Sequence, residues 1–190
     1  DGSKIFFVAA EPRPEDEEKA RKDGDDAIFV DEGPNGQRDG TWTNLWSLDV
    51  GSKEETRLTE EDHRIASFSV SPNGDQVVFT ARTENRRNQQ NQAEIHLLDV
   101  TSGETRQMTD NEAPEGRLTW APDGRRFVYE APSDDQWELR LDKLWIMDAE
   151  SGDRRMISEA FDGNIGSFSW TPAGSAILFS GLQGTDNNLF

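Results

Sequence analysis

The chain has 190 residues, with 38 acidic and 20 basic side chains, and its formal net charge is −18. Nucleic acid and anionic membrane surfaces repel such a chain, and the sequence has no basic stripe to contact phosphates, so we expect neither as a partner. The absence of cysteine excludes disulfides and thiolate metal sites, and no apolar run is long enough to span a membrane.

The strongest pattern is a repeat with a spacing of 50 residues. Three apolar runs each end in a turn, which reads Ser-Pro-Asn-Gly, Ala-Pro-Asp-Gly or Thr-Pro-Ala-Gly, with the prolines at Pro72, Pro122 and Pro172. Residues 1–4, Asp-Gly-Ser-Lys, match the end of a fourth copy. Repeats of about 40–50 residues built from short strands are typical of a β-propeller, with one repeat per blade.

Turn signals divide each repeat into short strands. In chain order, the first repeat (1–59) predicts strands at 4–10, 43–50 and 55–59; the second (60–109) at 65–71, 76–82, 93–100 and 104–109; the third (110–158) at 117–121, 125–131, 141–149 and 153–158; the last (159–190) at 165–171, 175–181 and 188–190. We therefore predict an all-β chain, a β-propeller fragment of about three and a half four-stranded antiparallel blades that forms one partial domain over residues 1–190.

The recurring residues have physical roles in this scheme. Proline presets φ in the turn and cannot continue a strand ladder, and glycine accepts a positive φ at the end of the turn. The second strand of each repeat is almost entirely apolar, which predicts burial on both faces of each blade. Asp49, Asp99 and Asp148 each end a third strand before a polar turn, so we expect them to accept backbone hydrogen bonds there rather than to act in catalysis.

The long insertion at 11–42 interrupts the first repeat. Its charged stretch at 11–20 predicts a solvated segment, either mobile or a short helix, and the run at 26–31 resembles a strand that would lengthen the sheet. Residues 31–40 faintly resemble a calcium loop, but the third acidic position is missing and Trp42 stands where the closing glutamate belongs. We therefore expect no bound metal.

Four features together resemble the blades of TolB-like propellers. They are the turn, the apolar strand, a Leu-Trp-x-x-Asp strand and a Gly-Glu turn that closes on Leu-Thr. They are equally similar to the propeller of the prolyl oligopeptidase family, above all its dipeptidyl peptidase and acylaminoacyl peptidase branches. The resemblance covers nearly the whole chain apart from 11–42. It implies a ring that caps a separate α/β-hydrolase domain and admits only short peptides, and this sequence lacks that hydrolase domain.

Catalytic residues are not recognisable in the sequence. Gly166-Ser-Phe-Ser-Trp170 lacks the second glycine of a nucleophile elbow, and only two histidines are present to serve a Ser-His-Asp triad. His96 replaces Trp46 and Trp145 of the other repeats, so we expect it to pack in a strand, whereas we expect His63 to be a solvated loop residue. The paired glutamates along the chain fit solvated charge. We expect no cofactor.

The four long segments of the chain, 11–42, 83–92, 132–140 and 182–187, follow second strands. Connections after second and fourth strands share one face of a propeller, which we call the long-loop face, and the other face carries short turns. Long loops on a rigid scaffold are where binding usually occurs, so we expect substrate or partner contacts there, although plain surface insertions remain an alternative. Arg86 and Arg87 are candidates to orient a peptide carbonyl or carboxylate; the alternative is a purely polar loop.

The favoured functional hypothesis is a non-catalytic propeller segment that gates a serine peptidase, with the hydrolase domain of the same polypeptide and short peptides as partners. The alternative is a TolB-like interaction scaffold without enzymatic activity, located in the periplasm or elsewhere in the cell envelope. A propeller enzyme with a central-channel site would need polar residues at the inner edge of several blades, and no such set is recognisable. Unpaired blade ends also predict a homo-oligomer or a longer parent protein. The dense acidic charge fits either a high-salt habitat or simple solubility.

Overall fold

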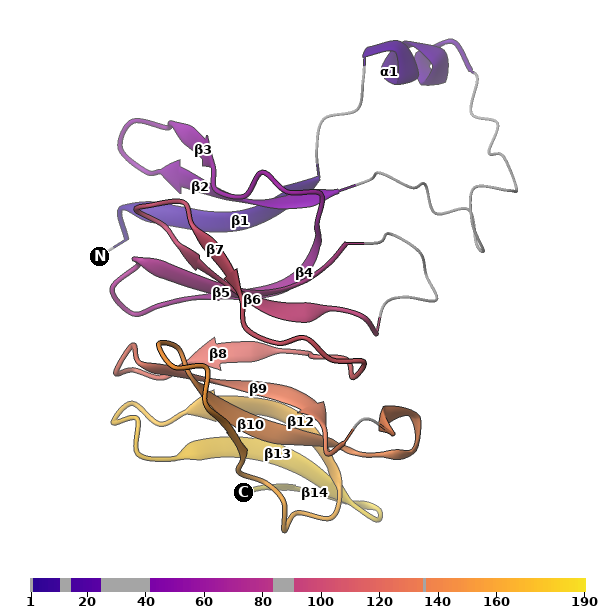
Figure 1. Ribbon diagram of the computed structural model, residues 1–190, viewed down its shortest axis with the longest axis vertical. Coiled ribbons are helices and arrows are strands. Elements are labelled where there is room, and N and C mark those ends of the chain that lie inside the picture. The colour runs from indigo at the N-terminus through magenta and orange to yellow at the C-terminus, as the bar shows by residue number, and fades with distance from the viewer. Residues whose placement is uncertain (1, 11–14, 25–41, 84–90, 135) are drawn as a thin grey trace. The chain divides into compact units, whose positions relative to one another are not determined.

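The computed structural model describes residues 2–10, 15–24, 42–83, 91–134 and 136–190 (Figure 1). The chain divides into two compact units. The N-terminal unit comprises Asp1–Ile65 and Arg82–Gln90, and the C-terminal unit comprises Ala66–Ala81 and Asn91–Phe190. Among the described residues, no helix combines the length and the apolar character needed to cross a membrane.

The N-terminal unit contains the first blade. Its strands β1 (Lys4–Ala10), β2 (Thr43–Asp49) and β3 (Glu55–Arg57) form an antiparallel sheet in that order. The insertion between β1 and β2 carries the helix α1 (Glu15–Lys22), which matches one of the two structures expected for its charged stretch. The run at 26–31 lies outside the described residues.

The second, third and fourth blades follow, and apart from the ends of β4 and β5 they lie in the C-terminal unit. Their strands are β4 (Arg64–Val70), β5 (Gln76–Arg82), β6 (Glu94–Asp99) and β7 (Thr105–Gln107); β8 (Leu118–Trp120), β9 (Arg126–Pro132), β10 (Asp142–Asp148) and β11 (Arg154–Met156); β12 (Asn164–Trp170), β13 (Ile177–Gln183) and β14 (Asp186–Leu189). Each blade is antiparallel from strand to strand. The predicted all-β propeller fragment is confirmed, and the strand boundaries differ from the predicted ones by one or two residues at most ends.

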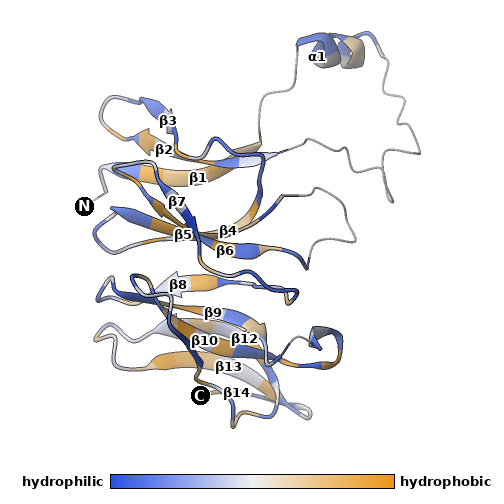
Figure 2. Ribbon diagram, viewed as in Figure 1, coloured by the Kyte–Doolittle hydropathy of each residue, from blue (hydrophilic) through white to orange (hydrophobic). Residues whose placement is uncertain are grey.

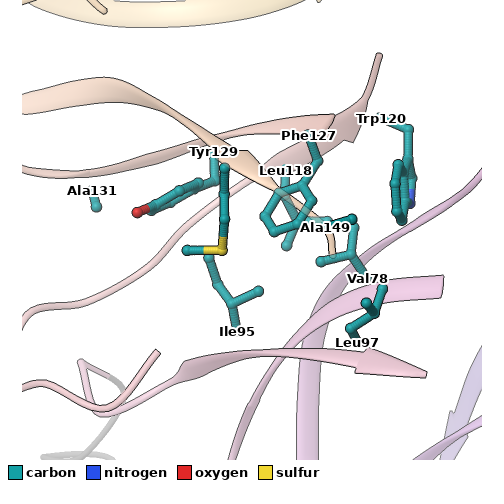
Figure 3. Close-up of a cluster of buried hydrophobic side chains, with 10 residues drawn as sticks. Val78, Ile95, Leu97, Leu118, Trp120, Phe127, Tyr129, Ala131 and Ala149 are labelled. Carbon is teal, nitrogen blue, oxygen red and sulfur yellow. The ribbon is translucent and has the colours of Figure 1, made fainter. Parts of the chain in front are cut away.

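The apolar second strands of the second and third blades, β5 and β9, are buried on both faces, as predicted, whereas Ile5 of β1 and Leu178 of β13 are exposed. Phe127 and Tyr129 of β9 point toward the second blade, whereas Val128, the residue between them, packs with Ile165 of the fourth blade. These three residues of β9 are fully buried. Figure 3 shows the first of these two clusters, whose members are Val78, Ile95, Leu97, Leu118, Trp120, Phe127, Tyr129, Ala131, Met147 and Ala149. Figure 2 shows the apolar colour along β10 and β13. The alternation of side chains along each strand therefore joins successive blades of this unit through apolar clusters.

A hydroxyl group closes each of the first three blades. In each of these blades, a backbone N–H near the start of the third strand donates to a Ser or Thr hydroxyl just beyond the fourth strand. The bonds run from Leu45 to Thr59 at 3.0 Å, from Ile95 to Thr109 at 2.7 Å, and from Leu144 to Ser158 at 2.8 Å. These donors are buried and would otherwise lack a partner at this edge. The hydroxyl residue at the end of each repeat therefore accepts a backbone hydrogen bond that holds the blade together.

The aspartate at the end of each third strand accepts two backbone hydrogen bonds, as predicted. The Oδ1 atom of Asp49 accepts from Gly51 and Ser52, that of Asp99 from Thr101 and Ser102, and that of Asp148 from Glu150 and Ser151, at 2.8–3.0 Å. The backbone hydrogen bond from the serine lowers the pKa of all three carboxyl groups. These aspartates are structural turn residues.

Candidate functional site

The residues proposed from sequence for ligand contact cannot be placed. Arg86 and Arg87 lie outside the described residues, as does the calcium-like loop at 31–40. Their roles stay predictions. In the described part of the chain, no group of three or more His, Cys, Asp or Glu side chains is arranged to hold a metal ion.

The two histidines have different outcomes. His96 stacks on Phe79 in the neighbouring strand with the ring centroids 5.3 Å apart, which confirms its packing role. The expectation for His63 was wrong, because this side chain is only 5% exposed. Burial lowers its pKa, although the nearby Glu61 carboxylate, 3.4 Å from Nε2, opposes that shift. A position in a loop did not imply solvation here, since the loop folds its histidine inward.

The described part of the long-loop side contains a buried acidic residue, Glu115, in the segment that joins β7 to β8. The Glu115 N–H points to the Ala93 carbonyl at 3.5 Å, and the next N–H, of Gly116, donates to the Glu130 carbonyl at 2.8 Å. The first carbonyl lies in the second blade and the other lies in the third. The segment therefore bridges two blades and carries the Glu115 side chain into the space between them.

The Glu115 carboxyl is 6% exposed and has polar neighbours on both oxygens. Thr109 donates its hydroxyl to Oε2 at 3.0 Å, and Asn111 donates its side-chain amide to Oε1 at 2.7 Å. Burial raises the pKa of Glu115 to about 8; the Asn111 hydrogen bond opposes this shift and the charge of Glu94 adds to it. Burial therefore favours the protonated form of Glu115, which lies close enough to Glu94 for that charge to raise its pKa further.

The Glu115 carboxyl group lies beneath the long-loop face. Tyr129 lies close enough for the Glu115 charge to affect it, and burial raises the pKa of the tyrosine hydroxyl to about 12. Neither the Glu115 carboxyl group nor a neutral tyrosine provides an activated nucleophile here. We assign the carboxyl group first to the structure of the interface between the blades.

Sequence reasoning missed the proximity of Glu115 and Glu94 because they are 21 residues apart and belong to different motifs. A sequence signal was nevertheless present at one position near the start of each third strand, just before its first aliphatic residue. That position holds Asn44, Glu94 or Lys143 in the first three repeats. Each of them contacts the segment that follows its own fourth strand. Asn44 accepts from the Thr59 hydroxyl at 2.8 Å, Glu94 accepts from the Asn111 N–H at 3.0 Å, and Lys143 donates to the Phe161 carbonyl.

Arg117 links the third blade to the fourth on the same side. Its guanidinium group donates to both carboxylate oxygens of Glu130 at 2.9–3.0 Å and to the Gly166 carbonyl, and it lies 5.3 Å from the centre of the Phe168 ring. Burial raises the pKa of Glu130, and the hydrogen bond from Arg117 opposes that shift. One side chain thus joins β8, β9 and β12.

The opposite side, which carries the short turns, contains a cleft of about 820 Å³ between the second and third blades. In Figure 1 the turns that join β8 to β9 and β12 to β13 lie at the left of the C-terminal unit, and the segment that joins β9 to β10 lies at the right. The charged groups of this cleft serve the fold: Arg106 donates to the Ala149 and Glu150 carbonyls, and Asp99 and Asp148 accept the turn hydrogen bonds described above.

Comparison with known proteins gives a fold. No protein-family model matches the chain, and no curated protein matches it. Among solved structures, TolB from Acinetobacter baumannii is 16% identical with a TM-score of 0.59 over 80% of this chain. An oligogalacturonate lyase from Vibrio parahaemolyticus is 17% identical with a TM-score of 0.59 over 77% of it. A structure from a study of two prolyl endopeptidases is 17% identical with a TM-score of 0.58 over 78% of it.

The chain spans only part of each of these proteins, namely 35% of the TolB chain, 44% of the lyase and 24% of the prolyl endopeptidase. At such identities the likeness concerns the fold alone. The chain has the fold of a β-propeller fragment, similar to the fold of the TolB structure.

Proposed function

We propose that the chain is a non-catalytic propeller segment that limits the access of substrate to a serine hydrolase domain elsewhere in the same polypeptide. The observation that carries this proposal is the packing of successive blades in the C-terminal unit through apolar clusters and hydrogen bonds. The likeness to a prolyl endopeptidase structure supports it. A wall of blades that resists opening is what a size-selective entrance requires.

The stiffness comes from contacts that repeat along the stack. Trp120 donates its indole N–H to the Ser69 carbonyl at 3.0 Å, and Trp170, one repeat later, donates to the Thr119 carbonyl at 3.2 Å. Each tryptophan thus bonds the inner strand of the preceding blade while its ring fills the interface. The Arg117 contacts add a polar link on the long-loop side. Folded proteins would be excluded sterically, and only short peptides would pass.

The substrate class that fits this role is short peptides that approach along the long-loop face. Arg86 and Arg87 would meet a peptide carbonyl or terminal carboxylate, because guanidinium groups bind such oxygens with two parallel hydrogen bonds. In a chain with a net charge of −18, two adjacent arginines would also provide a local attraction for an anionic peptide end.

The full-length protein tests this role. A fluorophosphonate probe should label one serine outside residues 1–190, and cleavage should fall steeply as peptide substrates lengthen toward folded proteins. The double variant R86A/R87A should raise KM for short peptides and leave kcat nearly unchanged. Equal cleavage of short peptides and folded proteins by a labelled enzyme would refute gating.

The second candidate is a TolB-like scaffold that binds other proteins and has no enzymatic activity. It is favoured by the likeness to the TolB structure, with a TM-score of 0.59. The same experiment separates the two functions. A full-length protein that shows neither labelling by the fluorophosphonate nor peptide hydrolysis would contradict the gate and leave the scaffold.

A further inference from the structure

Arg82 has no acidic partner among the described residues, although the chain carries 38 acidic side chains against 20 basic ones. It is the last residue of β5, where the strand leads into the long segment 83–92. Its side chain is half-buried, and its Nε atom is buried with no hydrogen-bond partner. By contrast, three other arginines each contact a carboxylate at 2.7–2.9 Å, namely Arg117, Arg126 and Arg140.

A second arginine lies near Arg82. Arg64 is the first residue of β4, the strand next to β5 in the sheet. In the fourth blade, the residues 100 positions later, Asn164 and Leu182, lie opposite each other in the ladder. Burial lowers the pKa of Arg82, and the charge of Arg64 lowers it further. Both arginines belong to the N-terminal unit, so their proximity is a feature of one compact body.

This arrangement lacks the acceptors that a partly buried arginine usually has. A guanidinium group keeps its charge in a protein, so removing it from water costs free energy that a carboxylate or several carbonyl groups normally offset. Arg106 shows the usual solution, because it donates to the carbonyl groups of Ala149 and Glu150. Near Arg82, the described residues provide a second cation instead. An anionic ligand would supply the acceptors.

We propose that Arg82 and Arg64 form an oxyanion-binding site at the long-loop end of β4 and β5. The ligand class is a carboxylate or a phosphate, because each can accept two parallel hydrogen bonds from one guanidinium group. Arg82 donates these hydrogen bonds, and the charge of Arg64 favours doubly charged anions. The site is distinct from the candidates Arg86 and Arg87 of the loop, and it does not depend on the gating role.

Inorganic phosphate and succinate are the two probes for this site. Each is titrated into the chain at constant ionic strength and followed by isothermal titration calorimetry, so that screening of the net charge stays the same throughout. The net charge of −18 repels anions from the surface as a whole, so saturable binding requires a local site. Tighter binding of phosphate would assign the site to phosphorylated ligands, and tighter binding of succinate would assign it to carboxylates.

Three variants locate the site. Arg82→Gln should weaken binding at least about tenfold, since it removes a pair of charge-assisted hydrogen bonds. Arg82→Lys keeps the charge without the planar fork and should retain part of the affinity. Arg140→Gln removes an arginine that already pairs with Asp134, and it should leave binding unchanged. Circular dichroism establishes that all three variants are folded.

Thermal unfolding gives a second measurement that does not depend on the heat of binding. The probe that binds should raise the melting temperature of the unmodified chain and of Arg140→Gln, because a ligand of the folded state stabilises it, and it should leave the melting temperature of Arg82→Gln unchanged. The proposal would be overturned if neither probe bound saturably, or if Arg82→Gln bound with the affinity of the unmodified chain.

Discussion

Lys53 holds a backbone conformation that favours glycine. Its φ is 65°, and the equivalent turn residues of the next two blades are Gly103 at 75° and Gly152 at 77°. A side chain in this left-handed region costs about 1 kcal/mol relative to glycine, because its Cβ crowds the backbone. Lys53→Gly should therefore raise the free energy of unfolding by about 1 kcal/mol, as measured by urea denaturation.

The converse variant is the control for this prediction. Gly103→Ala should lower the free energy of unfolding by a similar amount, since open space around Gly103 leaves backbone strain as the main effect. A Lys53→Gly variant that is no more stable than the unmodified chain would show that the lysine makes compensating contacts.

Glu115 should make stability depend on pH in the opposite sense to an ordinary ion-paired acid. Its folded pKa, about 8, lies above its ordinary value of 4.5. The folded state thus holds the proton more tightly, and this contribution to stability is complete below pH 4.5 and is lost as pH rises toward 8. Glu115→Gln should flatten this decline and make the variant more stable than the unmodified chain above pH 8.

Thermal unfolding from pH 5 to pH 9 measures this effect. Glu112, which is exposed in the same segment, provides the matched control, because Glu112→Gln should leave the pH profile unchanged. The buried carboxyl would not be the proton-binding group if the Glu115→Gln profile kept the full decline.

At the scale of the strand, the closing hydroxyl of each blade should contribute measurably to stability. Ser158 accepts from the Leu144 N–H, and Leu144 is 1% exposed, so Ser158→Ala would leave a buried donor without its partner. The expected loss is about 1–3 kcal/mol in the free energy of unfolding. Ser175→Ala, at an exposed turn position, should change it little. Equal stability of the two variants would contradict the role of the hydroxyl.

The repeat predicted the strands well because its signals are local. Pro72 and Gly74 define a turn through their own backbone preferences, and an apolar run such as Val77-Val78-Phe79 needs no partner to be recognised. Burial of polar residues is different, since it depends on which segments meet in space. His63 and Glu115 are buried because the connections that contain them fold inward between strands. The spacing of the repeat and the composition of the chain do not predict how those connections fold.

At the scale of the whole molecule, the outer face of the fourth blade should drive association. Leu178 is 43% exposed, whereas Val78 and Val128, its equivalents in the two preceding blades, are fully buried. Leu189 of β14 is exposed as well. Apolar surface of this kind contributes about 25 cal/mol for each Å² that it removes from water, so a partner surface should cover it.

Light scattering and calorimetry test this expectation on the 190-residue chain. We expect oligomers or a low melting temperature, and the double variant L178K/L182K should shift the population toward monomer without changing the circular dichroism spectrum. A monodisperse monomer with a high melting temperature would contradict it.

The net charge of −18 leads to a prediction about salt. Repulsion among surface carboxylates opposes the compact state, and screening removes most of that penalty by roughly 0.1–0.2 M salt, where the Debye length falls to about 8–10 Å. An ordinary acidic protein should therefore gain melting temperature over that range and then level off. A protein adapted to a high-salt habitat should continue to gain stability into the molar range.

Thermal unfolding in KCl, which avoids the strong exclusion effects of sulfate, measures the melting temperature over the whole range of salt concentration. We expect the melting temperature to rise from dilute buffer onward. A curve that levels off early assigns the acidic charge to solubility. A melting temperature that does not change with salt would show that carboxylate repulsion does not lower the stability of this fold.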